Sequence, residues 1–316
     1  MGASTQELFG AATVEPATPG SYGLRPSGYR LPDATRLGRV KLQVANIERS
    51  LAFYEHTLGL RVVARDAQSV RLAAQGDSRV LVELVERAGA RPSGRGQLGL
   101  YHFAILLPDR QSLGQFVRHL AATSTRAGSG DHLVSEAFYL TDPDGLGIEV
   151  YADRPRETWQ REGRELMIAT DPVDIHGLIA ASGDASWSGM PAGTVIGHVH
   201  LHVGNLTDAS AFYADSLGFD RMTWRYPGAL FLGAGGYHHH LGTNTWSGTG
   251  AQSPTENDAQ LLEWTIEVPT TSDVANVTQS LASSGREVDG LSANVVRTRD
   301  PWGGAIRIVA TDAAEP

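Results

Sequence analysis

The chain has 316 residues, too many for one ordinary hydrophobic core, and this length fits two domains of typical size. Its 41% hydrophobic and 19% charged residues are typical of a globular protein, and its net charge of −9 argues against nucleic-acid or membrane partners. No apolar run approaches the roughly 20 residues of a membrane helix, and MGASTQELFG lacks a secretory pattern, so we expect a cytoplasmic protein.

Residues 1–36 are rich in Gly, Pro, Ser and Thr, which predicts an N-terminal extension that lies over the surface or is partly disordered. Two later segments then share one pattern. RVKLQVANI from Arg39 matches HVHLHVGNL from His198, and both continue into an amphipathic stretch with a Phe-Tyr pair and a Leu-Gly pair. The matching positions share one offset of 159 residues, from Phe53 to Phe212. An internal repeat therefore organises the chain.

A second pair of segments repeats as well. DPDGLGIEV from Asp142 resembles DPWGGAIRI from Asp300, and HFAILLPD from His102 resembles EWTIEVPT from Glu263. The chain is therefore predicted to contain four units of one kind, at about 37–88, 98–154, 195–247 and 259–311. We expect a first domain at 37–154, a proline-spaced connector at 155–194 and a second domain at 195–311, which holds the proposed active site.

The third unit shows its secondary structure most clearly. In GHVHLHV, histidine alternates with aliphatic residues, which predicts a strand with His198, His200 and His202 on one face. The following segment predicts a helix with one apolar stripe, capped by Asn205 or Thr207 and ended by Gly218. The stripe contains Leu206, Ala209, Phe212, Tyr213 and Leu217. The helix would cover the aliphatic face of the sheet, so that the histidines line a concavity.

These motifs resemble those of the vicinal oxygen chelate superfamily, which includes glyoxalases, bleomycin-resistance proteins and extradiol dioxygenases. The segments YHFAILLPDR, DHLVSEAFYLTDPDGLGIEVYADRPRETW and GHVHLHV…GGYHHHLGTNTW are similar to the two-domain catechol 2,3-dioxygenase group. The resemblance covers about residues 30–311. It implies an α+β fold in which four βαβββ modules pair into two cupped open barrels, with a divalent metal in one cup.

The resemblance also implies where metal ligands would stand, namely at the start of each module's first strand and in its last strand. In the C-terminal half these positions hold His198, the run Tyr237–Leu241, Glu263 and Arg307. Arg307 replaces the usual glutamate. One interpretation builds a metal triad from His198, His240 (or His239) and Glu263, since two imidazoles and a carboxylate suit iron(II), with manganese(II) as the alternative. Because the chain has no cysteine, histidine and carboxylate are the side chains on which such a site depends.

Two other interpretations stay open. The metal site could be lost, with Arg307 neutralising Glu263 and Arg39 neutralising Glu149 as ion pairs in two symmetry-related cups. A metal could instead lie in the N-terminal half, where His102 and Glu149 are good ligands but Arg39 would place a cation beside them. Retention of metal in a His198→Ala variant would favour His102 and Glu149.

The remaining histidines and aromatic residues are candidates for catalysis and substrate binding. His239 resembles the acid–base histidine of extradiol enzymes, and His200 is the alternative for that role. Strict alternation along a strand sends the side chains of His239 and His240 to opposite faces. If both side chains enter the cup, a bulge is predicted after Gly235-Gly236. Candidate substrate contacts are His202, Tyr237, Asn244 and Trp246. Each of these is equally explained as a hydrogen-bonded lining or a packed strand-end residue.

The resemblance favours a metal-dependent extradiol dioxygenase that cleaves a small aromatic diol with dioxygen, in a pathway of aromatic degradation. A glyoxalase-type isomerase or lyase and a metal-free binding protein of the same fold are the competing hypotheses. The sequence leaves open whether the chain forms a homo-oligomer.

Overall fold

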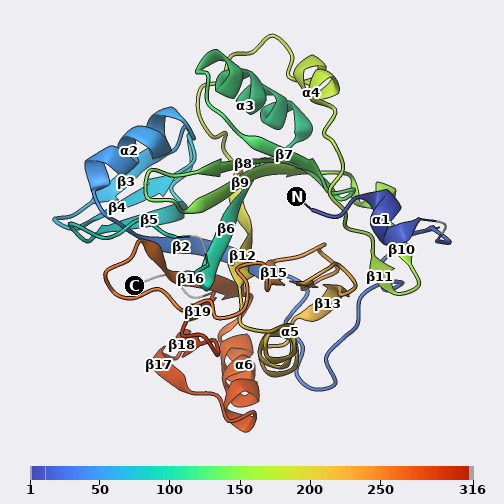
Figure 1. Ribbon diagram of the computed structural model, residues 1–316. Coiled ribbons are helices and arrows are strands. Elements are labelled where there is room, and N and C mark those ends of the chain that lie inside the picture. Colours follow the sequence, from blue (N-terminus) through green and yellow to red (C-terminus); the bar gives the residue numbers. More distant parts are fainter. Residues whose placement is uncertain (1, 11, 95, 313–316) are drawn as a thin grey trace.

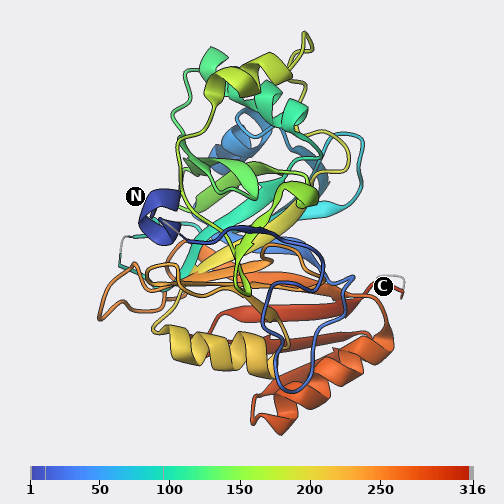
Figure 2. The ribbon, with the colours of Figure 1, turned by 90° about the vertical axis from the view of Figure 1, so that its right-hand side faces the viewer.

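The computed structural model describes residues 2–10, 12–94 and 96–312, and within them two eight-stranded sheets form the centre of the molecule (Figure 1). Helices cover the outer sides: in Figure 2 the blue and green helices lie above the strands, and the gold and orange helices lie below them. The expected α+β fold, with four modules paired into two cupped sheets, is confirmed.

Each predicted unit forms a strand, a helix and three further strands. The first unit contains β2 (Arg36–Val44), α2 (Ile47–His56), β3 (Arg61–Arg65), β4 (Ser69–Ala73) and β5 (Val80–Glu86). The second contains β6 (Gly99–Leu106), α3 (Arg110–Ala122), β7 (Gly128–Asp131), β8 (Ser135–Thr141) and β9 (Gly147–Asp153).

The third and fourth units follow the same order. The third contains β12 (Val195–His202), α5 (Leu206–Ala209), the π-helical turn η2 (Ser210–Ser216), β13 (Asp220–Thr223), β14 (Ala229–Gly233) and β15 (Leu241–Asn244). The fourth contains β16 (Gln260–Val268), α6 (Thr271–Ser283), β17 (Val288–Ser292), β18 (Val295–Arg299) and β19 (Ala305–Ala310).

The sheets do not pair the first unit with the second or the third with the fourth. One sheet has the order β13-β14-β15-β12-β6-β9-β8-β7 and so joins the second unit to the third. The other has the order β17-β18-β19-β16-β2-β5-β4-β3 and joins the first unit to the fourth. The expectation that the first and second units share one cup and the third and fourth share the other is therefore wrong, because β6 pairs antiparallel with β12 and β2 pairs antiparallel with β16. The division into domains at 37–154 and 195–311 stays a prediction.

The local structure of the third unit agrees with its sequence. The Asn205 side chain accepts from the Asp208 N–H at 2.7 Å and caps the helix, as one of the two expected residues. Gly218 has φ of 102°, and a Cβ there would lie 2.9 Å from the Leu31 nitrogen, so glycine is required at this position. The predicted apolar stripe packs into the core.

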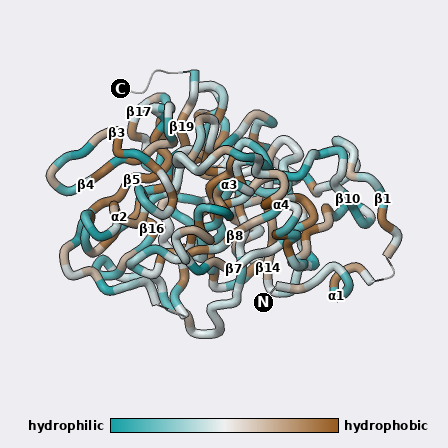
Figure 3. Tube along the Cα trace, turned by 90° about the horizontal axis from the view of Figure 1, so that it is seen from above, coloured by the Kyte–Doolittle hydropathy of each residue, from teal (hydrophilic) through white to brown (hydrophobic). Residues whose placement is uncertain are grey.

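One large apolar core lies between the helices and the sheets. It includes Phe116 of α3, Val199 of β12, Phe212 of η2 and Trp264 of β16, all of them fully or almost fully buried. Figure 3 shows hydrophobic and hydrophilic residues interleaved along the trace. This alternation gives each sheet one face against the helices and one polar face that lines a cup.

The extension and the connector pack against each other. The extension contains α1 (Thr5–Phe9) and β1 (Glu15–Pro16), and the connector contains η1 (Arg156–Thr158), β10 (Gln160–Glu162), β11 (Glu165–Leu166) and α4 (Ile175–Ala181). Strands β1, β10 and β11 form a three-stranded sheet, so both segments are ordered where they are described. None of the described helices has the length and apolar character needed to span a bilayer.

Candidate metal centre and active site

The sheet shared by the second and third units brings three potential ligands together. His198 of β12 lies opposite Ala104 of β6, and Ala104 lies beside Glu149 of β9 in the parallel pair β6–β9. His102 lies two residues before Ala104 and points to the same face. The polar face of three adjacent strands therefore carries His102, Glu149 and His198.

The ligand atoms of these residues are close enough to share one ion. Glu149 Oε2 lies 2.9 Å from His102 Nε2 and 3.2 Å from His198 Nε2, and the two Nε2 atoms lie 3.3 Å apart. All three side chains are buried. Among the described residues they form the one group of at least three histidine or acidic side chains in metal-binding proximity.

The buried environment shifts the pKa values of Glu149 and His198. Burial lowers the pKa of His198 to about 4, so its imidazole is neutral near neutral pH. Burial alone would favour the neutral form of Glu149, but its interactions with His198 and His102, which include hydrogen bonds to both, outweigh burial and hold the pKa of this carboxyl well below its usual range. Two imidazoles and a carboxylate with open positions suit iron(II) or a similar divalent ion.

The triad predicted from sequence is not brought together. Of its members, only His198 joins the cluster. Glu263 lies on β16 in the other sheet, where it accepts from Arg297 Nε at 2.7 Å and lies 4.0 Å from Arg39. His240 Nδ1 accepts from the Ala234 N–H at 3.2 Å, its ring stacks on that of Phe219, and it is not part of the cluster.

The physical reason is the pairing of the units. The expected triad assumed that His198 and Glu263 line one cup, whereas the partner of the third unit is the second. The proposed pairing of Arg39 with Glu149 is wrong for the same reason, since Arg39 Nε lies 2.9 Å from Glu83 in the other cup. The second unit carries two of the three ligands, His102 and Glu149, and the third unit carries the missing histidine. The sequence signal for the site was therefore that the second unit has two of the ligands and the third unit has one more histidine.

The histidine run 238–240 precedes strand β15 instead of lying on it, so the bulge predicted after Gly235-Gly236 is replaced by a turn. Within the run, His238 Nε2 lies 2.8 Å from Asp153 Oδ1, and its Nδ1 lies 2.7 Å from His239 Nδ1. A neutral His238 that donates to Asp153 must accept from His239 Nδ1–H. His239 then has an unprotonated Nε2, and its ring centroid lies 4.1 Å from that of His198.

A second chain of hydrogen bonds reaches the cluster from strand β8. Tyr139 is the cross-strand partner of Glu149 and its ring lies 5.5 Å from that of His102. Its hydroxyl contacts His132 Nε2 at 2.5 Å, and His132 Nδ1 lies 2.7 Å from the Ala169 carbonyl oxygen. His132 therefore donates from Nδ1 and accepts from Tyr139. Sequence reasoning missed Tyr139, although its cross-strand position beside Glu149 could have been read from the β8–β9 hairpin.

The remaining predicted residues line one side of the cup or support it. His200 is buried 5.0 Å from the His102 ring, and burial lowers its pKa well below the usual value. Trp246 is 42% exposed at the mouth, with its ring 5.5 Å from His200. Tyr101, which sequence reasoning also missed, is 40% exposed and lies 5.6 Å from Trp246, so the two rings form an aromatic rim.

Three of the predicted substrate contacts have internal partners. His202 Nδ1 donates to Asn244 Oδ1 at 2.6 Å, and Asn244 Oδ1 also accepts from the Trp246 backbone N–H at 3.0 Å. Tyr237 is buried behind the cluster, with its hydroxyl 2.6 Å from that of Tyr151. A role for these side chains in substrate binding stays a prediction.

Comparisons with known proteins identify the family of the chain. The model of the Glyoxalase/Bleomycin resistance protein/Dioxygenase superfamily matches residues 36–150 and 195–313. The chain belongs to this superfamily. It is 45% identical over 277 residues to a catechol-2,3-dioxygenase of Bacillus subtilis (strain 168), a match that covers 86% of this chain and 95% of that protein. The resemblance seen in the sequence is thus confirmed, and the chain groups with the dioxygenase enzymes of the superfamily.

Solved structures support the fold. A putative dioxygenase from Bacillus subtilis subsp. subtilis str. 168 matches with a TM-score of 0.64 at 14% identity, over 91% of this chain and 87% of that one. Glyoxalase I from Zea mays matches with a TM-score of 0.50 at 16% identity, over 88% and 92% of the two chains. At these identities the superfamily members share the fold, and their chemistry is not transferred.

Proposed function

We propose that the protein is a metal-dependent extradiol dioxygenase that cleaves the ring of a catechol-type diol, with the metal held by His102, Glu149 and His198. The proposal is supported by three ligand atoms, His102 Nε2, Glu149 Oε2 and His198 Nε2, which lie within 3.3 Å of one another on one face of the sheet. Iron(II) is the expected ion and manganese(II) the alternative, as the same ligands suit both. A cytoplasmic location stays part of the proposal.

The donor set fits such an ion on chemical grounds. A divalent ion there would supply open coordination positions and would acidify a hydroxyl of the bound diol. With Nδ1 bonded to His238, His239 offers Nε2 as an acceptor for the proton of a diol hydroxyl beside His198. The same imidazole can return the proton when the ring opens.

Two further groups would orient the diol. The Tyr139 hydroxyl donates to His132 and can accept a hydrogen bond from a substrate hydroxyl near Glu149. Tyr101 and Trp246 at the mouth offer ring faces and edges against which an aromatic substrate can pack. The mostly buried walls of the cup would exclude water from the diol, which strengthens these polar contacts.

The decisive experiment compares two pairs of matched variants after reconstitution with iron(II). Glu149→Gln and His198→Ala should lose bound metal by elemental analysis and lose oxygen consumption with catechol. Glu263→Gln and His240→Ala should keep near-stoichiometric metal. Loss of metal in Glu263→Gln with retention in Glu149→Gln would overturn the assignment of the site. Metal-loaded protein that consumes no oxygen with any catechol would overturn the dioxygenase function, and conversion of a thiol-conjugated aldehyde would favour a glyoxalase-type reaction.

A further inference from the structure

The sheet shared by the first and fourth units forms a second cup whose polar face differs in charge from the first. In the second cup, Lys41 of β2 is the cross-strand partner of Glu263 of β16, just as His200 of β12 is the cross-strand partner of His102 of β6 in the first cup. Arg307 pairs with Thr265 as Glu149 pairs with Ala104. The positions equivalent to the ligands His198, Glu149 and His102 are thus held by Arg39, Arg307 and Glu263, a set that repels a metal ion.

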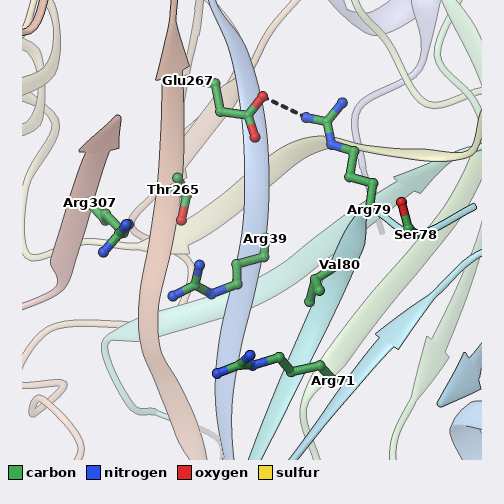
Figure 4. Close-up of a pocket in the computed structure, with 8 residues that line it drawn as sticks. All are labelled: Arg39, Arg71, Ser78, Arg79, Val80, Thr265, Glu267 and Arg307. Carbon is green, nitrogen blue, oxygen red and sulfur yellow. Dashed lines mark hydrogen bonds and ion pairs between the residues drawn. The ribbon is translucent and has the colours of Figure 1, made fainter. Parts of the chain in front are cut away.

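This second cup encloses a cavity of about 490 Å³, a size typical of small-molecule sites. Four of its eight lining residues are arginines, one is a carboxylate and one is apolar. They are Arg39, Arg71, Ser78, Arg79, Val80, Thr265, Glu267 and Arg307. Figure 4 shows the guanidinium groups of Arg39, Arg71 and Arg307 turned into the same space. We refer to this cavity as the arginine cup.

The acidic side chains near the arginine cup are already shared between cations. Glu267 Oε2 lies 2.8 Å from both Arg36 and Arg79, and Glu83 lies 2.9 Å from Arg39 and 3.1 Å from Lys41. The cavity lining therefore keeps an excess of positive charge, although the whole chain carries a net charge of −9. A concave surface of one sign concentrates its field on the space that it encloses.

We infer that the arginine cup binds a small anion with carboxylate or phosphate groups, at a site separate from the proposed metal centre. The planar guanidinium group can donate paired hydrogen bonds to two oxygens of either anion, and the hydroxyls of Ser78 and Thr265 add donors. Val80 is the single apolar residue of the lining, which favours a compact polar ligand over an aromatic one. Binding would also relieve the mutual repulsion of the arginines.

The test uses the metal-loaded full chain in low-salt, phosphate-free buffer, titrated calorimetrically in separate arms with inorganic phosphate and with the dicarboxylate cis,cis-muconate. We expect saturable binding of at least one anion, and the arm that binds identifies the class. Arg71→Gln, at the exposed position of β4, should weaken binding about tenfold or more, since a charge-assisted hydrogen bond contributes that much. Arg65→Gln removes the same charge outside the cup and should leave affinity unchanged within about twofold.

A further variant separates this site from the metal centre, where anions could also bind. His198→Ala, which we expect to lack metal, should bind the anion with the affinity of the parent protein. Binding of neither anion, or equal losses in Arg71→Gln and Arg65→Gln, would overturn the inference. If only His198→Ala lost binding, the anion would be assigned to the metal centre, and the inference for the arginine cup would be overturned as well.

Discussion

The hydroxyl of Tyr54 in α2 donates a hydrogen bond of 3.2 Å to the buried carboxylate of Asp142, which stands in the turn between β8 and β9. The pair Tyr213–Asp300 repeats this bond at 2.7 Å in the other half of the chain. Each bond joins the helix of one unit to the Asp-Pro turn of the next unit. The first unit is therefore bonded to the second, and the third to the fourth, through helix and turn, while the strands of the two units in each of these pairs belong to different sheets.

Removal of either tyrosine hydroxyl should destabilise the protein. Tyr54→Phe and Tyr213→Phe should each lower the free energy of unfolding by about 1–3 kcal/mol, because each removes the hydroxyl donor from one oxygen of a buried carboxyl group whose other oxygen keeps its backbone donors. Urea unfolding followed by circular dichroism measures the effect. Tyr29→Phe is the matched control, since the Tyr29 hydroxyl is buried with no hydrogen-bond partner among the described residues. A Tyr29→Phe loss as large as the other two would contradict the role of the bonds.

Asp142 should make the stability depend on pH. Burial raises its pKa from 3.8 to about 6, so the folded state favours the protonated carboxyl. Below about pH 4 both the folded and the unfolded states bind this proton, and there is no cost. Between about pH 4 and 6 the unfolded state releases it first, so stability falls as pH rises, by roughly 3 kcal/mol in total. Relative to Asp142→Asn, the parent protein should lose stability across this window, and parallel curves would contradict the assignment.

The repeat and the alternation of residues were sufficient to predict the four units, the β12 strand and the helix that follows it. The pairing of units could not be predicted, because the four first strands have similar patterns and each could lie beside any other. The choice depends on long-range contacts such as Val199 with Phe103, which no local pattern encodes. The difference between the expected triad and the observed cluster followed from that pairing: His198 belongs to both, but its partners were sought in the fourth unit.

Removal of the metal should destabilise the protein if the cluster holds it. At a free metal concentration of 100 times Kd, binding contributes about 2.7 kcal/mol, which a chelator such as EDTA would abolish and so lower Tm. His198→Ala should show a Tm that does not change with EDTA, whereas Glu263→Gln should respond as the parent does. These outcomes are readable by differential scanning calorimetry without any substrate. A Tm of the parent that EDTA leaves unchanged would argue against a resident metal.

The Tyr139–His132 pair should matter for turnover more than for metal binding. Tyr139→Phe removes the hydroxyl that would orient the diol and should lower kcat for oxygen consumption by about tenfold to a hundredfold, with metal content unchanged. His132→Gln keeps an amide that can accept from Tyr139 and should lose less. A fall in metal content that matches the fall in activity would instead show that Tyr139 acts through Glu149, its strand neighbour.

Gly242 of β15 should control the position of His200. A Cβ at Gly242 would lie 2.8 Å from His200 Cγ, closer than side chains tolerate, so Gly242→Ala must turn the imidazole away from its place beside His102. If His200 contacts the substrate, Gly242→Ala should reduce kcat/KM for a catechol to the level of His200→Ala while the bound metal stays near stoichiometric. Gly290→Ala on β17 is the control, since a Cβ added at Gly290 would have no other atom within 4 Å. Activity of Gly242→Ala equal to that of Gly290→Ala would remove His200 from the catalytic proposal and leave the proton to His239.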